Sequence, residues 1–520
     1  MRAGRWVLVA TLPLSLLVLA PAALRAQDAA AGKPVYDQWC AGCHGVDGKG
    51  EGTGAATMLP RPRDFTRAQY QIRTTGSGEL PTDADILHVI NVGMPNTAMP
   101  GWEELLSETE RNDLVAYLKS LSRFFEGAAP APLELTDGPG VSDEGIADGK
   151  ATYEKIECMK CHGTEGRADG TSATTLKDDL GNPIDPANLT QNWLFNGGGT
   201  AADIYHRLRT GLDGTPMPTF SDLIASGIVT DDQLWNLAYY VRSLSPEDAP
   251  EVREVITAAV LVEGEQLPTS PTDARWATVE RFYVPLVGQI ILKPRWYSPR
   301  VSNLWVQALH DSTEVAMLVS WSDPSSSPDS AWMPFAQRVV DLMGPKDEGS
   351  TWVPGSADQL VVQFPQTLTT GMERPYFLQG DARRPAYLWN WRSDRNTAVE
   401  MVAKGFGTGQ EQAAGSQQVT ASASWANGEW RVLFRRTLST SDTTADLQMP
   451  GATVVPVAFQ AWDGDNGEAG TQAAVSTWYF LALEEATPAT VFVAPVLAFL
   501  LTAVLGVVLV SRAQKREKEG

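Results

Sequence analysis

The sequence predicts a multidomain protein with two all-α domains, one all-β sandwich domain and one C-terminal transmembrane helix. Three observations predict this: a duplicated N-terminal unit, a long stretch of short Val-, Leu-, Trp- and Phe-rich runs, and a charge-free apolar segment near the end. At about 150 residues per domain, the length of 520 residues suits three or four domains. The net charge of −21 argues against a nucleic-acid partner and is compatible with basic redox proteins.

The duplicated unit contains all four cysteines, in two copies of Cys-x-x-Cys-His. This is the attachment motif of c-type haem, in which both thiols bind the porphyrin and the histidine offers an imidazole to the iron. A dithiol redox motif or half of a zinc site would leave the histidine that follows each pair unexplained. We therefore predict two covalent haem c groups on Cys40, Cys43, His44, Cys158, Cys161 and His162.

A methionine that follows each haem motif keeps the same spacing in both copies. Cys40 and Cys158 are 118 positions apart, and so are Met99 and Met217, each of which precedes a proline. A Gly-Lys pair and a tyrosine precede each haem motif, and a capping-box pattern opens an amphipathic helix at the end of each copy. These patterns occur at Gly32, Lys33, Tyr36 and Ser107-x-x-Glu110, and again at Gly149, Lys150, Tyr153 and Thr230-x-x-Gln233.

This order of features resembles class I cytochrome c, over residues 28–125 and 144–246. The resemblance implies His44 and Met99 as the axial iron ligands of the first haem, and His162 and Met217 as those of the second.

Two alternatives for the sixth iron ligand stay open. Met94 also precedes a proline, although the register of the repeat favours Met99. His88 and His206 are a further duplicated pair, again 118 positions apart. We expect these histidines to support the domains or to lie near the haem edge.

Residues 253–485 are predicted to form the sandwich, because turn residues separate their short apolar runs. Runs at 304–309 and 315–321 flank a short turn, and Asn427-Gly428 is a strong two-residue hairpin signal. His310, the one histidine of this region, falls in the predicted turn, where we expect it at the surface.

Several strings of this region resemble the haem-binding γ subunit of ethylbenzene dehydrogenase and its dimethyl sulfide dehydrogenase relatives: Arg374-Pro375-Tyr376-Phe377-Leu378-Gln379-Gly380-Asp381, Leu388-Trp389-Asn390-Trp391 and Val457-Ala458-Phe459-Gln460-Ala461-Trp462-Asp463-Gly464. The resemblance implies a b-type haem between a methionine and a lysine, and a molybdenum enzyme with an iron–sulfur subunit as partner. Here the two ligand positions correspond to Gln379 and a site near Ala473. Met333, Met372, Met401 and Lys404 are the conceivable substitutes, so a haem b is left open.

Both ends of the chain carry membrane signals. Arg2 and Arg5 precede an apolar run and small residues, which predicts a signal peptide over 1–26, with an uncleaved N-terminal anchor as the alternative. Residues 491–510 form an uncharged apolar run, long enough for a transmembrane helix. The tail 511–520 is basic, which predicts a cytoplasmic C-terminus and a large periplasmic part on the bacterial cytoplasmic membrane.

Together these features predict a membrane-anchored periplasmic dihaem cytochrome that relays electrons and is not itself an enzyme. Its partner would be a molybdopterin oxidoreductase or a respiratory complex. A haem enzyme such as a peroxidase or an oxidase of sulfur compounds is the alternative, as is a ligand-sensing sandwich with a haem reporter. Such enzymes need an open iron or an unusual ligand, whereas this sequence offers a methionine to each haem. We assign no catalytic residue.

Overall fold

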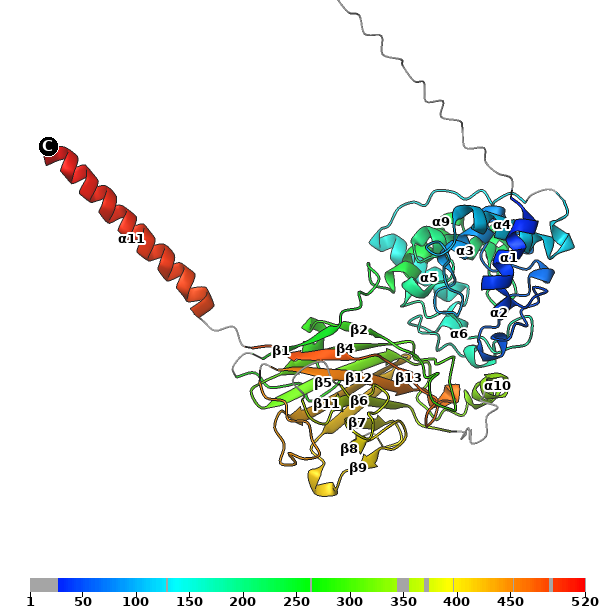
Figure 1. Ribbon diagram of the computed structural model, residues 1–520. Coiled ribbons are helices and arrows are strands. Elements are labelled where there is room, and N and C mark those ends of the chain that lie inside the picture. The colour runs from blue at the N-terminus through cyan, green and yellow to red at the C-terminus, as the bar shows by residue number, and fades with distance from the viewer. Residues whose placement is uncertain are drawn as a thin grey trace, which may run out of the picture.

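The computed structural model places the two helical domains side by side, with the β domain beneath them and a separate C-terminal helix (Figure 1). The structure describes residues 27–127, 130–261, 264–343, 355–368, 374–395, 397–451, 453–485 and 490–519. The predicted signal peptide 1–26 and Met372 lie outside the described residues.

The two helical domains share one order of helices, to which the second domain adds α8. The first contains α1 (Ala29–Trp39), α2 (Ala41–His44), the 3-10 turn η1 (Ala55–Thr57), α3 (Asp83–Val92) and α4 (Glu108–Ser120). The second contains α5 (Asp143–Lys155), α6 (Met159–His162), η4 (Ala173–Thr175), α7 (Ala201–Thr210), α8 (Ser221–Ala225) and α9 (Asp231–Ser243). Both predicted capping boxes form, at the starts of α4 and α9.

The first and last helices of each domain cross at a glycine. A Cβ atom at Gly32 of α1 would lie 2.1 Å from the carbonyl oxygen of Asp113 in α4. At Gly149 of α5 it would lie 2.0 Å from the carbonyl oxygen of Asn236 in α9. Only a residue without a side chain allows the two backbones to approach this closely. The repeated glycine of the sequence therefore fixes the helix crossing in both domains.

The β domain is one continuous path of strands in the order β10-β11-β5-β4-β1-β14-β12-β6-β7-β8-β9, with β2, β3 and β13 beside it. The strands are β1 (Val255–Val260), β2 (Phe282–Pro285), β3 (Val287–Gly288), β4 (Asn303–His310), β5 (Glu314–Ser322), β6 (Gln359–Pro365), β7 (Ala386–Arg392), β8 (Thr397–Ala403), β9 (Gln410–Glu411), β10 (Thr420–Ala426), β11 (Glu429–Thr437), β12 (Val454–Trp462), β13 (Ala474–Val475) and β14 (Tyr479–Leu483).

This path folds into two layers because β12 belongs to both. Residues 454–457 of β12 pair with β14, and residues 458–462 pair with β6. Trp391 of β7 then faces Trp321 of β5 and Trp430 of β11, with ring centroids 6.1 and 4.9 Å apart, although β7 forms no ladder with either strand. The predicted sandwich is thus confirmed, and its core lies between these layers.

The domain departs from a plain sandwich in three respects. Strand β1 runs parallel to both β4 and β14, so the sheet is mixed. A helix, α10 (Met333–Met343), interrupts the strands, and its buried Phe335, Val339 and Met343 recur every four residues. His310 is not at the surface: it ends β4 with 5% of its area exposed, and its Nε2 lies 2.9 Å from the carbonyl oxygen of Glu484. This partner in a distant segment explains its burial.

The helix α10 joins the β domain to both helical domains. It packs against η1 of the first and η4 of the second, which are equivalent positions of the repeat. Arg61 donates to the carbonyl of Leu342 at 3.2 Å, and Arg338 donates to that of Thr174 at 2.8 Å. One helix therefore braces both copies of the repeat at the same structural position.

The C-terminal helix α11 (Thr490–Glu519) stands apart from the other domains (Figure 1). Within it, the segment Val493–Lys518 is long and apolar enough to cross a membrane: its most apolar 18 residues have a mean hydropathy of 2.8, and none of them is buried. The helix α11 as a whole contains the run 491–510 predicted from the sequence.

Candidate haem sites in the helical domains

The first haem motif opens onto an apolar cavity. Cys40, His44 and Met99 line it together, and its other walls are Phe65, Ile90, Trp102, Leu114 and Leu118. The Nδ1 atom of His44 lies 3.0 Å from the carbonyl oxygen of Arg63. Because a carbonyl only accepts, Nδ1 carries the proton and Nε2 is free to bind a metal. The residues of this domain therefore fit a c-type haem with an imidazole on one face.

The second domain repeats this arrangement. Nδ1 of His162 lies 2.9 Å from the carbonyl oxygen of Ala187, and both Cys158 and Met217 pack against the same hydrophobic core. The acceptors follow their histidines by 19 residues in the first domain and 25 in the second. This unequal spacing breaks the register of the repeat, and sequence comparison of the two copies therefore missed the acceptors.

Buried tyrosines hold the turn behind each histidine. The hydroxyl of Tyr36 donates to the carbonyl of Gly45 at 2.6 Å, and that of Tyr153 donates to Gly163 at the same distance. Burial lowers the pKa of both His44 and His162, so that their imidazoles are neutral and suited to metal coordination. The tyrosine of each repeat thus supports the proximal side of its site.

The methionine loops of the two domains have the same hydrogen bonds. The hydroxyl of Thr97 donates to the Met94 carbonyl at 2.7 Å and accepts from the Met99 amide at 3.1 Å. In the second loop the Thr215 hydroxyl donates to the Leu212 carbonyl at 2.7 Å and accepts from the Met217 amide at 3.2 Å. Met94 therefore corresponds to an apolar leucine, which supports Met99 as the counterpart of Met217.

The duplicated histidines do not occupy equivalent surroundings. His88 is exposed on α3 and does not line the first cavity. His206 on α7 is partly buried at the boundary between the helical domains, and this burial lowers its pKa. These positions favour supporting roles over iron ligation.

The cysteines do not resemble a redox dithiol or a zinc site. Burial raises the pKa of Cys40 to about 11 and that of Cys158 to about 12, whereas reactive dithiols need a lowered thiol pKa. In the described part of the chain, the one group of three residues placed to hold a metal ion contains only aspartates. The haem interpretation is therefore preferred for both motifs.

The two β-domain positions that the family resemblance implies as haem b ligands do not fit that role. The side chain of Gln379 donates to Gln460 at 3.1 Å and accepts from the Gly407 amide at 3.1 Å, and its backbone amide donates to Gln363. Ala473 is fully buried in a hydrophobic cluster. The first position is thus occupied by a paired glutamine network and the second has no ligand atom.

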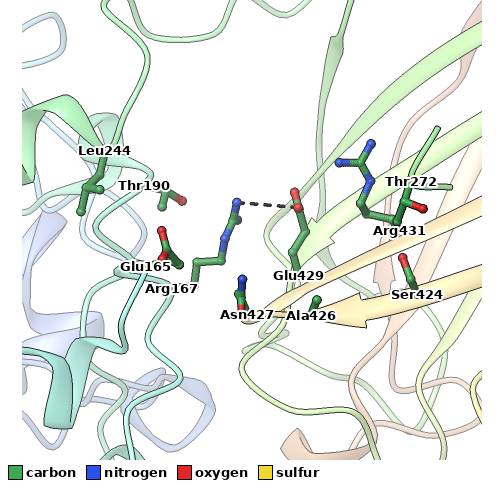
Figure 2. Close-up of a pocket in the computed structure, with 10 residues that line it drawn as sticks. All are labelled: Glu165, Arg167, Thr190, Leu244, Thr272, Ser424, Ala426, Asn427, Glu429 and Arg431. Atoms are coloured by element: carbon green, nitrogen blue, oxygen red, sulfur yellow. Dashed lines mark ion pairs between the residues drawn. The ribbon is translucent and has the colours of Figure 1, made fainter. Parts of the chain in front are cut away.

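A polar cleft of about 380 Å³ separates the second helical domain from the β10–β11 hairpin (Figure 2). Arg167 reaches across it to Glu429, with an ion-pair distance of 3.7 Å. The hairpin has the predicted turn, with Asn427 and Gly428 both at positive φ. None of the residues predicted to bind haem lines this cleft. We therefore treat it as part of the contact between the second helical domain and the β domain.

A buried acidic cluster lies where the β domain meets the second helical domain. Asp323, Asp358 and Asp463 are wholly buried, and Arg300 pairs with Asp463 at 3.0 Å and with Asp185 of the helical domain at 3.3 Å. Burial, and then the neighbouring Asp463, raises the pKa of Asp358 to about 8 and that of Glu468 to about 7.

These shifts predict that the β domain loses stability as the pH rises. In the folded protein the pKa of Asp358 and of Glu468 lies above its value in the unfolded chain, so folding favours the protonated carboxyls. Their contribution to stability is therefore complete below about pH 4, and it declines as the pH rises to about 7 or 8. We expect the free energy of unfolding to fall by about 2 kcal/mol or more between pH 5 and pH 8. Urea unfolding followed by tryptophan fluorescence checks this. A chelator is present so that no cation binds the three aspartates. Stability that rises over that range would contradict it.

Comparison with known proteins finds relatives of both the cytochrome domains and the β domain. The cytochrome c family model matches residues 29–122 and 146–245, and the ethylbenzene dehydrogenase model matches residues 273–420. The γ subunit of chlorate reductase from Ideonella dechloratans is 26% identical over 239 residues, which cover 45% of this chain and 86% of the relative.

Three other relatives each match less than half of the chain. The CcoP subunit of a cbb3-type cytochrome c oxidase from Azospirillum brasilense is 27% identical, over 41% of this chain and 61% of its own length. Cytochrome c-554(547) from Halothiobacillus neapolitanus is 35% identical, over 18% of this chain and 99% of its own. A solved chain of the Kuenenia stuttgartiensis reducing HAO-like complex is 44% identical, over 42% of this chain and 96% of its own, with a TM-score of 0.39.

Proposed function

This chain is a c-type cytochrome with two cytochrome c domains and a domain of the ethylbenzene dehydrogenase γ-subunit type, and from that premise we propose that it is a membrane-anchored electron relay with no substrate chemistry of its own. A haem iron between an imidazole and a thioether supplies one-electron transfer at a raised potential.

The observation that carries the proposal is that each domain has an oriented histidine and a hydrogen-bonded methionine loop, and that in the first domain the histidine and the methionine line one cavity. The carbonyls of Arg63 and Ala187 orient the two imidazoles, and Thr97 and Thr215 shape the two loops. Leu114 and Leu118 line the first cavity with apolar surface that excludes water. If His44 with Met99 and His162 with Met217 filled both axial positions of each iron, neither site would leave room for a substrate at the metal.

We further propose a redox enzyme as the partner, either a molybdopterin oxidoreductase or a respiratory complex. The relatives named chlorate reductase subunit gamma and cbb3-type oxidase subunit CcoP support this, because each is a subunit of a redox enzyme. In the β domain, Gln379 and Ala473 offer no ligand atom to a haem. This domain would then serve as the surface on which the partner enzyme docks. The c haems would then receive or deliver the electrons.

The membrane arrangement follows from α11. Its apolar segment would span the bilayer once, and Arg512, Lys515 and Arg516 would hold its C-terminal end on the cytoplasmic side. The cytochrome and β domains would then lie in the periplasm, where c-type haem is attached.

Haem content and electron capacity test the proposal in the full-length protein. We expect a pyridine haemochrome spectrum of c type alone, with two haems per chain, and a reversible redox titration that takes up two electrons. A b-type component would contradict the assignment of the β domain. One haem per chain, or turnover of peroxide by the purified protein, would contradict the relay.

The partner has its own measurement. Complexes isolated from the native membranes through a C-terminal tag should contain molybdenum, or the metals of an oxidase, in a fixed ratio to this chain. Chemical reduction of that partner by its substrate should then reduce both c haems. Isolation of the chain without any other redox metal would contradict the proposed assembly.

A further inference from the structure

The two methionine loops differ at one chemically important position. They share their internal hydrogen bonds, but the second loop has Asp213 where the first has Pro95. Asp213 lies four residues before Met217. A carboxylate at this point gives the second loop an anchor that the first loop lacks.

All the donors that reach Asp213 come from the first cytochrome domain. Arg73 donates to its Oδ1 at 2.8 Å, Ser77 donates to the same oxygen at 3.2 Å, and the Gly78 amide donates to Oδ2 at 2.9 Å. The Arg73 side chain is fully buried, and that of Asp213 is 16% exposed. Such a sheltered charge pair is far less screened by solvent than a surface ion pair.

Arg73 itself is rigidly held. Its Nε donates to the Gly76 carbonyl at 3.0 Å and its Nη1 to the Tyr70 carbonyl at 3.0 Å, both within its own domain. Its Nη2 also donates across the boundary to the carbonyl of Thr210, the last residue of α7, at 2.7 Å. The guanidinium therefore contacts both the end of α7 and the loop that follows it.

The contact is reciprocal. Arg207 of α7 donates to the Arg73 carbonyl at 2.7 Å. The segment 73–78 of the first domain is thereby fixed to α7 and to the Met217 loop of the second.

We propose that Arg73 and Asp213 are positioning residues through which the first cytochrome domain holds the Met217 loop on the second haem. The inference rests on the proposed function, because it takes Met217 to be an axial ligand. Its consequence is an asymmetry: the sulfur ligand of the second haem depends on docking of the two domains, while that of the first depends on its own loop alone.

Competition by an external ligand tests this in the full-length oxidised protein. Imidazole displaces a methionine sulfur from ferric haem and removes its sulfur-to-iron charge-transfer band. For Asp213→Ala we expect the band to be lost in two phases of equal amplitude. The first haem should keep the wild-type midpoint imidazole concentration, and the second haem should have a midpoint at least about tenfold lower. Asp213→Asn, which keeps the shape and one acceptor oxygen, should give a smaller shift in the same phase.

The matched control is Asp179→Ala. The Asp179 side chain accepts from Gln69 of the first domain at 2.9 Å, so this variant loses an acidic side chain from the same boundary. It keeps the backbone amide of residue 179, which donates to Gly214 of the ligand loop at 3.2 Å. It should titrate as the wild type does. A single wild-type-like phase in both Asp213 variants would overturn the proposal, as would an equal shift in Asp179→Ala. A wild-type protein without any sulfur-to-iron band would instead refute the ligand assignment of the proposed function.

Discussion

Replacement of Gly149 by alanine is expected to abolish haem attachment in the second cytochrome domain and to leave one haem per chain. The new Cβ would lie 2.0 Å from the carbonyl oxygen of Asn236 and 2.5 Å from its carbon, both backbone atoms that no side-chain rotation can move. Separation of α5 from α9 would open the core of the domain at a cost of about 3 kcal/mol or more. The pyridine haemochrome content and the thermal unfolding of the variant measure both effects.

Two further glycine variants complete the test: the first should repeat the effect and the second is the control. Gly32→Ala places a Cβ 2.1 Å from the Asp113 carbonyl oxygen and should have the same effect in the first domain. Gly42→Ala, inside the first haem motif, meets no atom within 4 Å and should keep both haems. A Gly149→Ala protein with two haems and wild-type stability would show that this crossing does not limit the fold.

The second large effect is expected from removal of a methionine ligand. In Met99→Ala and in Met217→Ala, one iron should lose its sulfur ligand, and the reduced protein should bind one carbon monoxide per chain without denaturant. The potential of the altered haem should fall, because a thioether stabilises ferrous iron. The wild type should bind none, and Met94→Ala should behave as the wild type because Met94 matches Leu212 in the second loop. Carbon monoxide binding by the wild type would contradict closed sites.

The sequence was most informative where local patterns repeat. The haem motifs, the capping boxes of α4 and α9, and the Asn427-Gly428 hairpin each depend on residues close in sequence, and the structure contains all of these elements. The repeat register also paired Met99 with Met217, and the hydrogen bonds of the two loops agree.

Features that depend on distant contacts were missed. Arg73 and Asp213 are 140 positions apart, and no periodic pattern connects them. The burial of His310 depends on Glu484, which is 174 positions away. The helix α10 is a different case: Phe335, Val339 and Met343 have helical spacing, but the surrounding strand pattern obscured it. The parallel pairing of β1 with β4 and β14 has no local signal at all.

X-ray absorption at the iron edge of the oxidised full-length protein tests the central claim most directly, because it identifies the atoms bound to both irons at once. We expect one sulfur ligand per iron, with nitrogen in every other position. An average of half a sulfur per iron, or of none, would contradict the pairing of His44 with Met99 or of His162 with Met217, and would direct attention to His88 and His206 instead.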